Sequence, residues 1–296
     1  MTSATDYVFT RDYVDNNRYV DSYLTLKRLV ANGSALRIIS INLQHYLSGE
    51  LFGYLTHPDI PTRDPHLKIA DVGTGTGIWL TELGGRLPKS VHLDGLDISF
   101  HATPPAQWLP SNMTLRLWDV KAHVPEDLAG RYDIVHIRNF AFVLQSDDIQ
   151  HVLDNLIKLI RPGGYLQWAE PDVASFRIEK TKPENNVDAL RQLLHLSQGQ
   201  DARLSPTWVP NLTTLFTNSG LGDVQSDARD APPHLALAMH ECSLPIHELI
   251  ARKTQNEGVT HALTDLMPEI AKETREGSCW AFTRWIVIGR KPRECA

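Results

Sequence analysis

The sequence predicts an α/β fold in which helices cover both faces of a mainly parallel sheet. From residue 66 onward, short apolar runs alternate with longer helical patterns, which is typical of βαβ units. The runs are apolar over nearly their whole length, as expected for strands that are buried on both faces. A glycine-rich segment follows the first run and precedes a helical pattern, so a sharp turn is expected there.

Five strands and two helices are predicted in the first part of this region. The helices are expected at 78–87 and 147–160, and the second has its apolar residues on one face at helical spacing. Arg161-Pro162-Gly163-Gly164 is expected to end the second helix. The strands are expected at 67–72, 91–98, 113–120, 132–139 and 165–170.

Helical patterns dominate the two flanks. Before the core, apolar spacing predicts helices at 18–32 and 35–54, followed by a proline-rich linker. After it, we expect helices at 185–197, 207–219, 232–255 and 258–276, and strands near 223–228 and at 280–292. We expect the last two helices to form a lid over the strand ends. The predicted parts are an N-terminal helical cap (1–60), a ligand-binding core (61–175), and the rest of the core with a helical lid (176–296).

Composition and charge argue against several kinds of partner. The 296 residues are 42% hydrophobic and 22% charged, which is ordinary for a globular protein. The net charge is −6 without a lysine/arginine run, so we expect no nucleic-acid partner. Because neither an apolar stretch of about 18 residues nor a secretory signal is visible, we expect no membrane partner and a cytoplasmic location. Cys242, Cys279 and Cys295 have no metal-ligand spacing, so we expect no metal.

The strongest functional signal is the segment Asp71-Val-Gly73-Thr74-Gly75-Thr-Gly77, between a predicted strand and a predicted helix. Glycines let a backbone turn sharply and approach a ligand without a Cβ clash. The start of the helix offers free N–H groups to a carboxylate, and Asp71 offers a negative charge to an amine. The methionine end of S-adenosylmethionine (SAM) has both groups on one carbon, so the segment favours a SAM site.

Two other interpretations of this segment stay open. A dinucleotide site requires the pattern G-x-G-x-x-G, whereas Ile78 stands at the position of the last glycine. Asp71 would also repel a pyrophosphate. The remaining interpretation is a glycine turn with only a structural role.

Two further acids lie at the ends of the next two predicted strands. Asp97, followed by Ile98, comes 20 residues after Gly77, where such folds place an acid that accepts hydrogen bonds from ribose hydroxyls. The third strand ends in Trp118-Asp119-Val120, where Asp119 is placed to accept the adenine amino group beside an apolar neighbour. The carboxyl ends of three consecutive strands therefore carry acids, at the edge where open α/β sheets bind ligands.

With these segments, the sequence resembles class I SAM-dependent methyltransferases from about residue 68 to 172. The resemblance is carried by DVGTGTG (71–77), GLDIS (95–99), WDV (118–120), YDIVHIRN (132–139) and RPGGYLQWAEPD (161–172). More narrowly, it is similar to fungal secondary-metabolism methyltransferases, including the LaeA-like group. WLPSN (108–112) and the Gln44-His45 pair carry that narrower likeness.

The resemblance implies a Rossmann-like sheet of seven strands with the last one antiparallel. It implies that Asp71 and the glycines of the loop hold the methionine part of SAM, that Asp97 takes the ribose, and that Asp119 takes the adenine. It also places Arg138 and Asn139 beside the methyl donor.

Methyl transfer requires alignment of nucleophile, methyl and sulfur, and a hydroxyl acceptor usually benefits from a general base. His45, in the helix that could cap the pocket, His240, in the predicted lid, and Glu170, at the end of the fifth strand, are the candidates for catalysis. Each also has a plainer interpretation. His45 can be a surface residue, Glu170 can bind the backbone, and the heptad spacing of His240 and His247 is typical of an amphipathic helix. His136, inside a strand, is expected to pack in the core.

Three functions remain open. The leading hypothesis is SAM-dependent methylation of an O or N atom of a small-molecule secondary metabolite. The second is a SAM-binding cyclase or pericyclase of the same fold that does not consume SAM. The third is a LaeA-like regulatory protein. The acceptor is undetermined, and the apolar faces of residues 1–60 leave a homodimer open.

Overall fold

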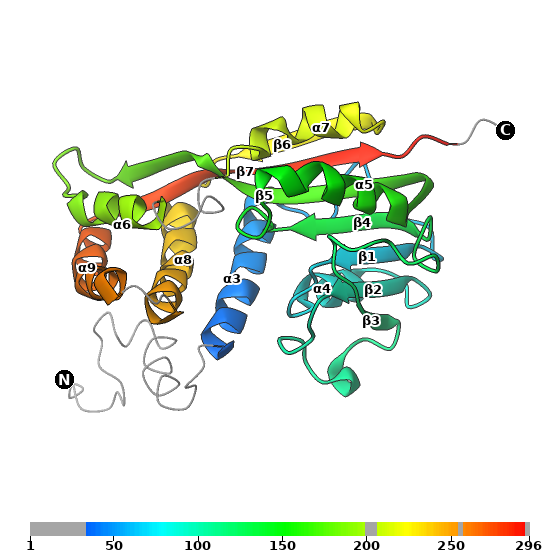
Figure 1. Cartoon of the computed structure of the whole chain (residues 1–296), viewed down its shortest axis with the longest axis horizontal. Helices are drawn as coiled ribbons and strands as arrows, with labels where there is room; N and C mark the ends of the chain where they lie inside the picture. The colour runs from blue at the N-terminus through cyan, green and yellow to red at the C-terminus, as the bar shows by residue number, and fades with distance from the viewer. Residues whose placement is uncertain (1–33, 199–205, 254–256, 294–296) are drawn as a thin grey trace, which may run out of the picture.

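The computed structural model describes residues 34–198, 206–253 and 257–293. The helix expected at 18–32 lies outside these residues. A seven-stranded sheet has the order β3-β2-β1-β4-β5-β7-β6 (Figure 1). Its strands are β1 (Lys68–Val72), β2 (His92–Asp97), β3 (Met113–Leu117), β4 (Tyr132–Arg138), β5 (Ile160–Lys180), β6 (Gly222–Arg229) and β7 (Ser278–Arg290).

Only β7 runs against its neighbours in this sheet. The β1–β2, β1–β4, β2–β3 and β4–β5 pairs are parallel, whereas β7 is antiparallel to both β5 and β6. This arrangement confirms the predicted mainly parallel sheet of seven strands with an antiparallel last strand.

Helices cover both faces of the sheet, as predicted. One face packs against α5 (Ile149–Leu159), the 3₁₀ turn η4 (Val209–Asn211) and α7 (Leu212–Asn218), around the fully buried Trp168. The other face packs against α3 (Ser34–Phe52), α4 (Ile78–Arg86) and the first turns of α8 (Pro233–Lys253). The apolar stripe on α5 that predicted this helix is the surface that it buries.

The fifth strand is longer than expected, because it continues well past Glu170 to Lys180. A register shift between Asp172 and Arg177 interrupts its pairing, after which β5 and β7 continue as a two-stranded extension beyond the other strands (Figure 1). Proline is uncommon inside a strand, but Pro171 pairs with Arg284 of β7, and the strand continues past it. The expected break at 161–164 is also part of this strand, where Gly163 and Gly164 bond to Lys291 of the chain after β7.

A separate helical cluster covers the extension. It consists of α6 (Asp188–Gln198), α9 (Glu257–Arg275) and the rest of α8. Its core contains Leu190, Leu193, Leu263, Ile270 and Trp280. The two helices expected as a lid therefore pack on the extended strands. The division into cap, core and lid stays a prediction.

Helix α3 lies between this cluster and the glycine segment, next to α8 (Figure 1). The Ser40 hydroxyl donates to the Cys242 carbonyl of α8 at 2.9 Å. On the other side, the Thr76 hydroxyl donates to Asn42 Oδ1 at 2.7 Å. These two bonds fix α3 over the carboxyl edge of the sheet. Within the described parts of the chain, no helix is long and apolar enough to span a bilayer.

Candidate active site

The glycine segment forms a tight loop after β1. The N–H groups of Gly73 and Thr74 both donate to the Leu96 carbonyl of β2, at 2.7 and 3.2 Å. Gly73 has φ +68°, and a Cβ there would lie 2.4 Å from the Phe140 ring. Gly75 has φ +56°, but a Cβ there would meet only the Gly73 carbonyl, at 3.8 Å. Gly73 is therefore required by packing, whereas Gly75 presents an open backbone surface. Gly77 leads directly into α4.

Asp71 lies beneath this loop and is buried. Its Oδ2 accepts from the Thr74 hydroxyl at 2.9 Å, and its Oδ1 accepts from His136 Nδ1 at 2.7 Å. His136 is stacked on Trp79, with ring centroids 3.8 Å apart. His136 is thus a core residue, as expected, and it orients Asp71. Contact between Asp71 and a ligand amine stays a prediction, because both carboxylate oxygens already have a protein partner.

Asp97 faces the loop from the end of β2. Its Oδ2 accepts from the Gly75 N–H at 2.8 Å, and its Oδ1 accepts from the Ser99 N–H at 3.2 Å. Asp97 is only partly buried, and the adjacent Ile98 side chain is 72% exposed. The carboxylate is therefore fixed by the loop and still accessible to hydroxyl donors, with an apolar surface beside it.

Of the three residues after β3, only Asp119 is exposed. Trp118 and Val120 are buried in the core, and Trp118 Nε1 donates to the His123 carbonyl at 3.2 Å. Asp119 Oδ1 accepts from the Lys121 N–H at 2.9 Å, which holds the carboxylate in place. Asp119 can reach a ligand, whereas Trp118 contributes its side chain to the sheet core.

These residues fit SAM. The open surface at Gly75 leaves space for the amino-acid part, and two accessible carboxylates follow at the ends of β2 and β3. Carboxylates accept hydrogen bonds from ribose hydroxyls and from the adenine amino group. Within the described residues, no group of three or more histidine, cysteine, aspartate or glutamate side chains is arranged to hold a metal.

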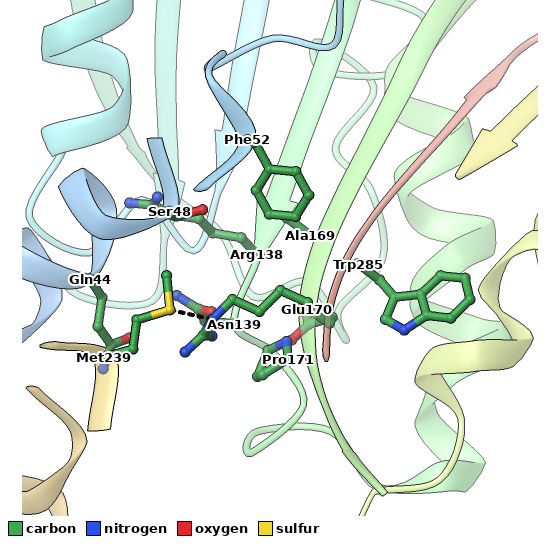
Figure 2. Close-up of a pocket in the computed structure, with 11 residues that line it drawn as sticks. Gln44, Ser48, Phe52, Arg138, Asn139, Ala169, Glu170, Pro171, Met239 and Trp285 are labelled. Carbon is green, nitrogen blue, oxygen red and sulfur yellow. Dashed lines mark hydrogen bonds between the residues drawn. The ribbon is translucent and has the colours of Figure 1, made fainter. Parts of the chain in front are cut away.

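A pocket lies between α3, α8, the end of β4 and the middle of β5 and β7 (Figure 2). It encloses about 420 Å³ between protein atoms, part of it open to solvent. The lining residues are Gln44, Ser48, Phe52, Arg138, Asn139, Ala169, Glu170, Pro171, Met239, Arg284 and Trp285. In Figure 2, the Trp285 indole lies across β7 from Gln44 and Met239, so the pocket is bordered mainly by α3, α8, the end of β4 and the middle of β5.

Two predicted site residues, Arg138 and Glu170, line this pocket. Glu170 is buried and accepts from the N–H groups of Phe140 and Ala141, at 2.7 and 2.9 Å, and from Trp168 Nε1 at 2.7 Å. Burial raises the pKa of Glu170 to about 7 despite these three donors. Glu170 therefore fixes the loop after β4 and holds a group that titrates near neutrality at the pocket wall.

His45 is buried behind the pocket, on α3. Its Nε2 donates to Glu82 Oε2 at 2.5 Å, and its Nδ1 has no partner in the described residues. Burial, and then the charge of Arg138, lower the pKa of His45, while its contact with Glu82 acts in the opposite direction. Its neighbours Gln44 and Ser48, rather than His45 itself, line the pocket.

His240 lies outside the pocket, in the helical cluster. Its Nε2 and the Thr274 hydroxyl are 3.0 Å apart, and its Nδ1 accepts from the Trp280 N–H at 3.4 Å. Burial lowers the pKa values of His240 and His247 to about 4. The structure therefore does not bring His240 to the cofactor residues, although Met239, the preceding residue, lines the pocket.

Sequence reasoning missed the α8 and β7 side of the pocket. Nothing in the sequence distinguishes Met239 from the other apolar residues of an amphipathic helix, so it gives no signal of a binding residue. Arg284 has one, because it is a lone charge in the middle of the apolar strand Ser278–Arg290. An arginine in the middle of an apolar strand is a candidate binding residue, since an unpaired charge in the core is costly.

Comparisons with known proteins show the family to which the chain belongs. A family model described as a methyltransferase domain matches residues 43–226. Methyltransferase grgD from a Penicillium species is 42% identical over 117 residues, which cover 37% of this chain and 40% of that protein. N-methyltransferase tcpN from Claviceps purpurea is 31% identical over 194 residues, which cover 64% of this chain and 67% of that protein.

Among solved structures, the [4+2]-cyclase SpnF is 14% identical, with a TM-score of 0.51 over 79% of each chain. This likeness concerns the fold alone. The match to the Penicillium relative spans well under half of that protein's length.

Proposed function

The chain belongs to the class I SAM-dependent methyltransferases, and on that premise we propose that it methylates an oxygen or nitrogen atom of a small-molecule secondary metabolite. The observation that carries the proposal is the open glycine loop that bonds to Asp97 through Gly75 N–H. The named activity of the Claviceps relative supports nitrogen as the acceptor atom. A cytoplasmic location and a homodimer stay predictions.

We propose that the cofactor lies along the ends of β1, β2 and β3. The loop at Gly73–Gly77 takes the amino-acid part, Asp97 the ribose hydroxyls, and Asp119 the adenine amino group. Ile98, exposed beside Asp97, packs against the base. SAM supplies a methyl group bound to a sulfonium sulfur. The neutral thioether that remains after transfer is a good leaving group.

The pocket beside the end of β4 and the middle of β5 is proposed as the acceptor site. Gln44 and Ser48 of α3 supply polar groups that orient the acceptor, while Phe52 and Met239 supply apolar surface that excludes water. An amine acceptor needs no dedicated base once it is neutral. For a hydroxyl acceptor, Glu170 is the remaining candidate to take a proton, by giving up one of the three protein hydrogen bonds that its carboxylate accepts.

The test is turnover by the purified protein with SAM and a panel of amine and hydroxyl metabolites. We expect release of S-adenosylhomocysteine (SAH) together with an acceptor that has gained one methyl group. Conversion of an acceptor without SAH release would contradict methyl transfer and favour the cyclase alternative. SAM binding without turnover of any acceptor would favour the regulatory alternative.

A further inference from the structure

Arg284 occupies an unusual place in the sheet. It lies in β7 opposite Pro171 of β5 and Arg229 of β6, so these three side chains share one face. Arg284 is partly buried and lines the proposed acceptor pocket.

The guanidinium of Arg284 is largely without partners. Its Nε donates to Met239 Sδ at 3.0 Å, which is the dashed line in Figure 2. A thioether sulfur is a weak acceptor. In the described chain, no carboxylate lies within 4.0 Å of Arg284, and neither Nη nitrogen has a hydrogen bond. Neither Nη nitrogen is among the fully buried unpaired atoms, so each keeps some accessible surface, and Arg284 is one of the residues that line the pocket.

Other arginines of the same sheet have counter-ions. Arg229 Nη2 lies 2.8 Å from Asp227 Oδ2, and Arg290 Nη1 lies 3.5 Å from Asp223 Oδ2. Burial lowers the pKa of Arg284 to about 10, with only the Cys242 thiol acting in the opposite direction. An arginine remains charged at neutral pH even so.

The rest of the pocket does not supply the missing charge. Glu170 is on the opposite face of β5 from Pro171, and its oxygens already accept three protein hydrogen bonds. Arg138 adds a second cation to the pocket lining, and the nearby carboxylates that act on its charge are Asp71 and Glu82, neither of which lines the pocket. Since a buried charge is costly without a counter-ion, a negative group is expected from the ligand.

From this geometry we propose that Arg284 binds a carboxylate of the acceptor, so that the substrates are organic acids. The proposal rests on the proposed function, since it assumes that this pocket takes the acceptor. Two free Nη groups form a fork that matches both oxygens of a carboxylate. Met239 orients the fork through Nε. A carboxylate held there is fixed against β7, so that the rest of the acceptor extends toward Arg138 and the cofactor loop.

The test compares benzoate with benzamide, which has a similar shape and no charge. Both are titrated by calorimetry into protein saturated with SAH. We expect wild-type protein to bind benzoate at least about tenfold more tightly, which corresponds to roughly 1.4 kcal/mol. Arg284→Gln is expected to remove this preference while leaving benzamide binding unchanged. Arg284→Lys, which keeps the charge without the fork, is expected to retain part of it.

Arg290→Gln is the matched control, because Arg290 is on the same strand and already paired with Asp223. It is expected to keep the full preference for benzoate. If Arg284→Gln does not fold, the reduced preference in Arg284→Lys is the deciding measurement.

Three results would overturn the proposal: no measurable benzoate binding, equal affinity of wild-type protein for the two probes, or a preference that survives in Arg284→Gln. Measuring SAH affinity shows whether the acid specificity alone fails or whether the proposed function fails as well. If wild-type protein binds SAH but shows no preference for benzoate, only the acid specificity fails. If Arg284→Gln weakens SAH binding as strongly as benzoate binding, Arg284 belongs to the cofactor site and the proposal also fails.

Discussion

Two buried carboxylates, Asp71 and Glu170, hold the loops that surround the site. Asp71 accepts from Thr74 in the glycine loop, and Glu170 accepts from the backbone of Phe140 and Ala141 after β4. The Phe140 ring in turn lies against Gly73. Both carboxylates therefore act on the loops between which the cofactor and acceptor are proposed to meet.

The titration of Glu170 gives a prediction about stability. Burial raises its pKa in the folded protein to about 7, from 4.5 for an unperturbed glutamate. The folded state then binds one proton more than the unfolded state between these values, so this residue lowers the free energy of unfolding as pH rises from about 4.5 to about 7. The loss is about 3 kcal/mol at 1.36 kcal/mol per pKa unit.

Glu170→Gln removes this titration. We expect urea unfolding of wild-type protein between pH 5 and pH 7.5 to show a decline in stability that the variant lacks. Parallel pH profiles for the two proteins would contradict the raised pKa.

At the scale of elements, a substitution in the glycine loop is expected to have separate effects on the free energy of unfolding and on SAH affinity. Gly75→Ala places a Cβ in open space at φ +56°, so we expect it to cost roughly 1–2 kcal/mol through left-handed strain alone. Because this surface is proposed to face the cofactor, we also expect SAH affinity to fall at least about tenfold, or roughly 1.4 kcal/mol. Thermal unfolding and calorimetry measure the two effects.

Gly53→Ala is the matched control for this loop. Gly53 has φ +72° after α3, and a Cβ there would meet nothing within 4 Å. The same strain is expected, with unchanged SAH affinity. Equal SAH affinity in the Gly75→Ala and wild-type proteins would show that the cofactor does not approach this face of the loop.

The positions of the core strands in the chain were predictable, because each has an apolar run bounded by turn residues. The extension of β5 was not, since Pro171 and Asp172 resemble a strand end and the partner strand begins about a hundred residues later. The placement of His240 also depends on tertiary contacts. Heptad spacing with His247 gives the shared helix face, but whether that face meets the pocket or Trp280 depends on how α8 packs.

For the whole molecule, the sheet and its extension define where the site lies. The parallel strands bring Asp97 and Asp119 to one edge, which their positions after strands predict from the sequence. The pocket proposed for the acceptor is lined by α3, α8 and β7, which are far apart in the chain and have no shared sequence pattern. Sequence reasoning could therefore single out the residues proposed to bind the cofactor, whereas it could not bring Met239 and Arg284 together.

The central claim is that SAM binds at the carboxyl edge of the sheet, with Asp97 on its ribose. Calorimetric titration of SAH into wild-type protein and Asp97→Ala tests it most directly, with Asp127→Ala as the control because Asp127 is an exposed acid paired with Arg116. We expect binding to wild type and to the control, and a loss of roughly 1.5–3 kcal/mol in Asp97→Ala, as for hydrogen bonds to a charged group. Absence of SAH binding to wild type, or full affinity in Asp97→Ala, would contradict the account.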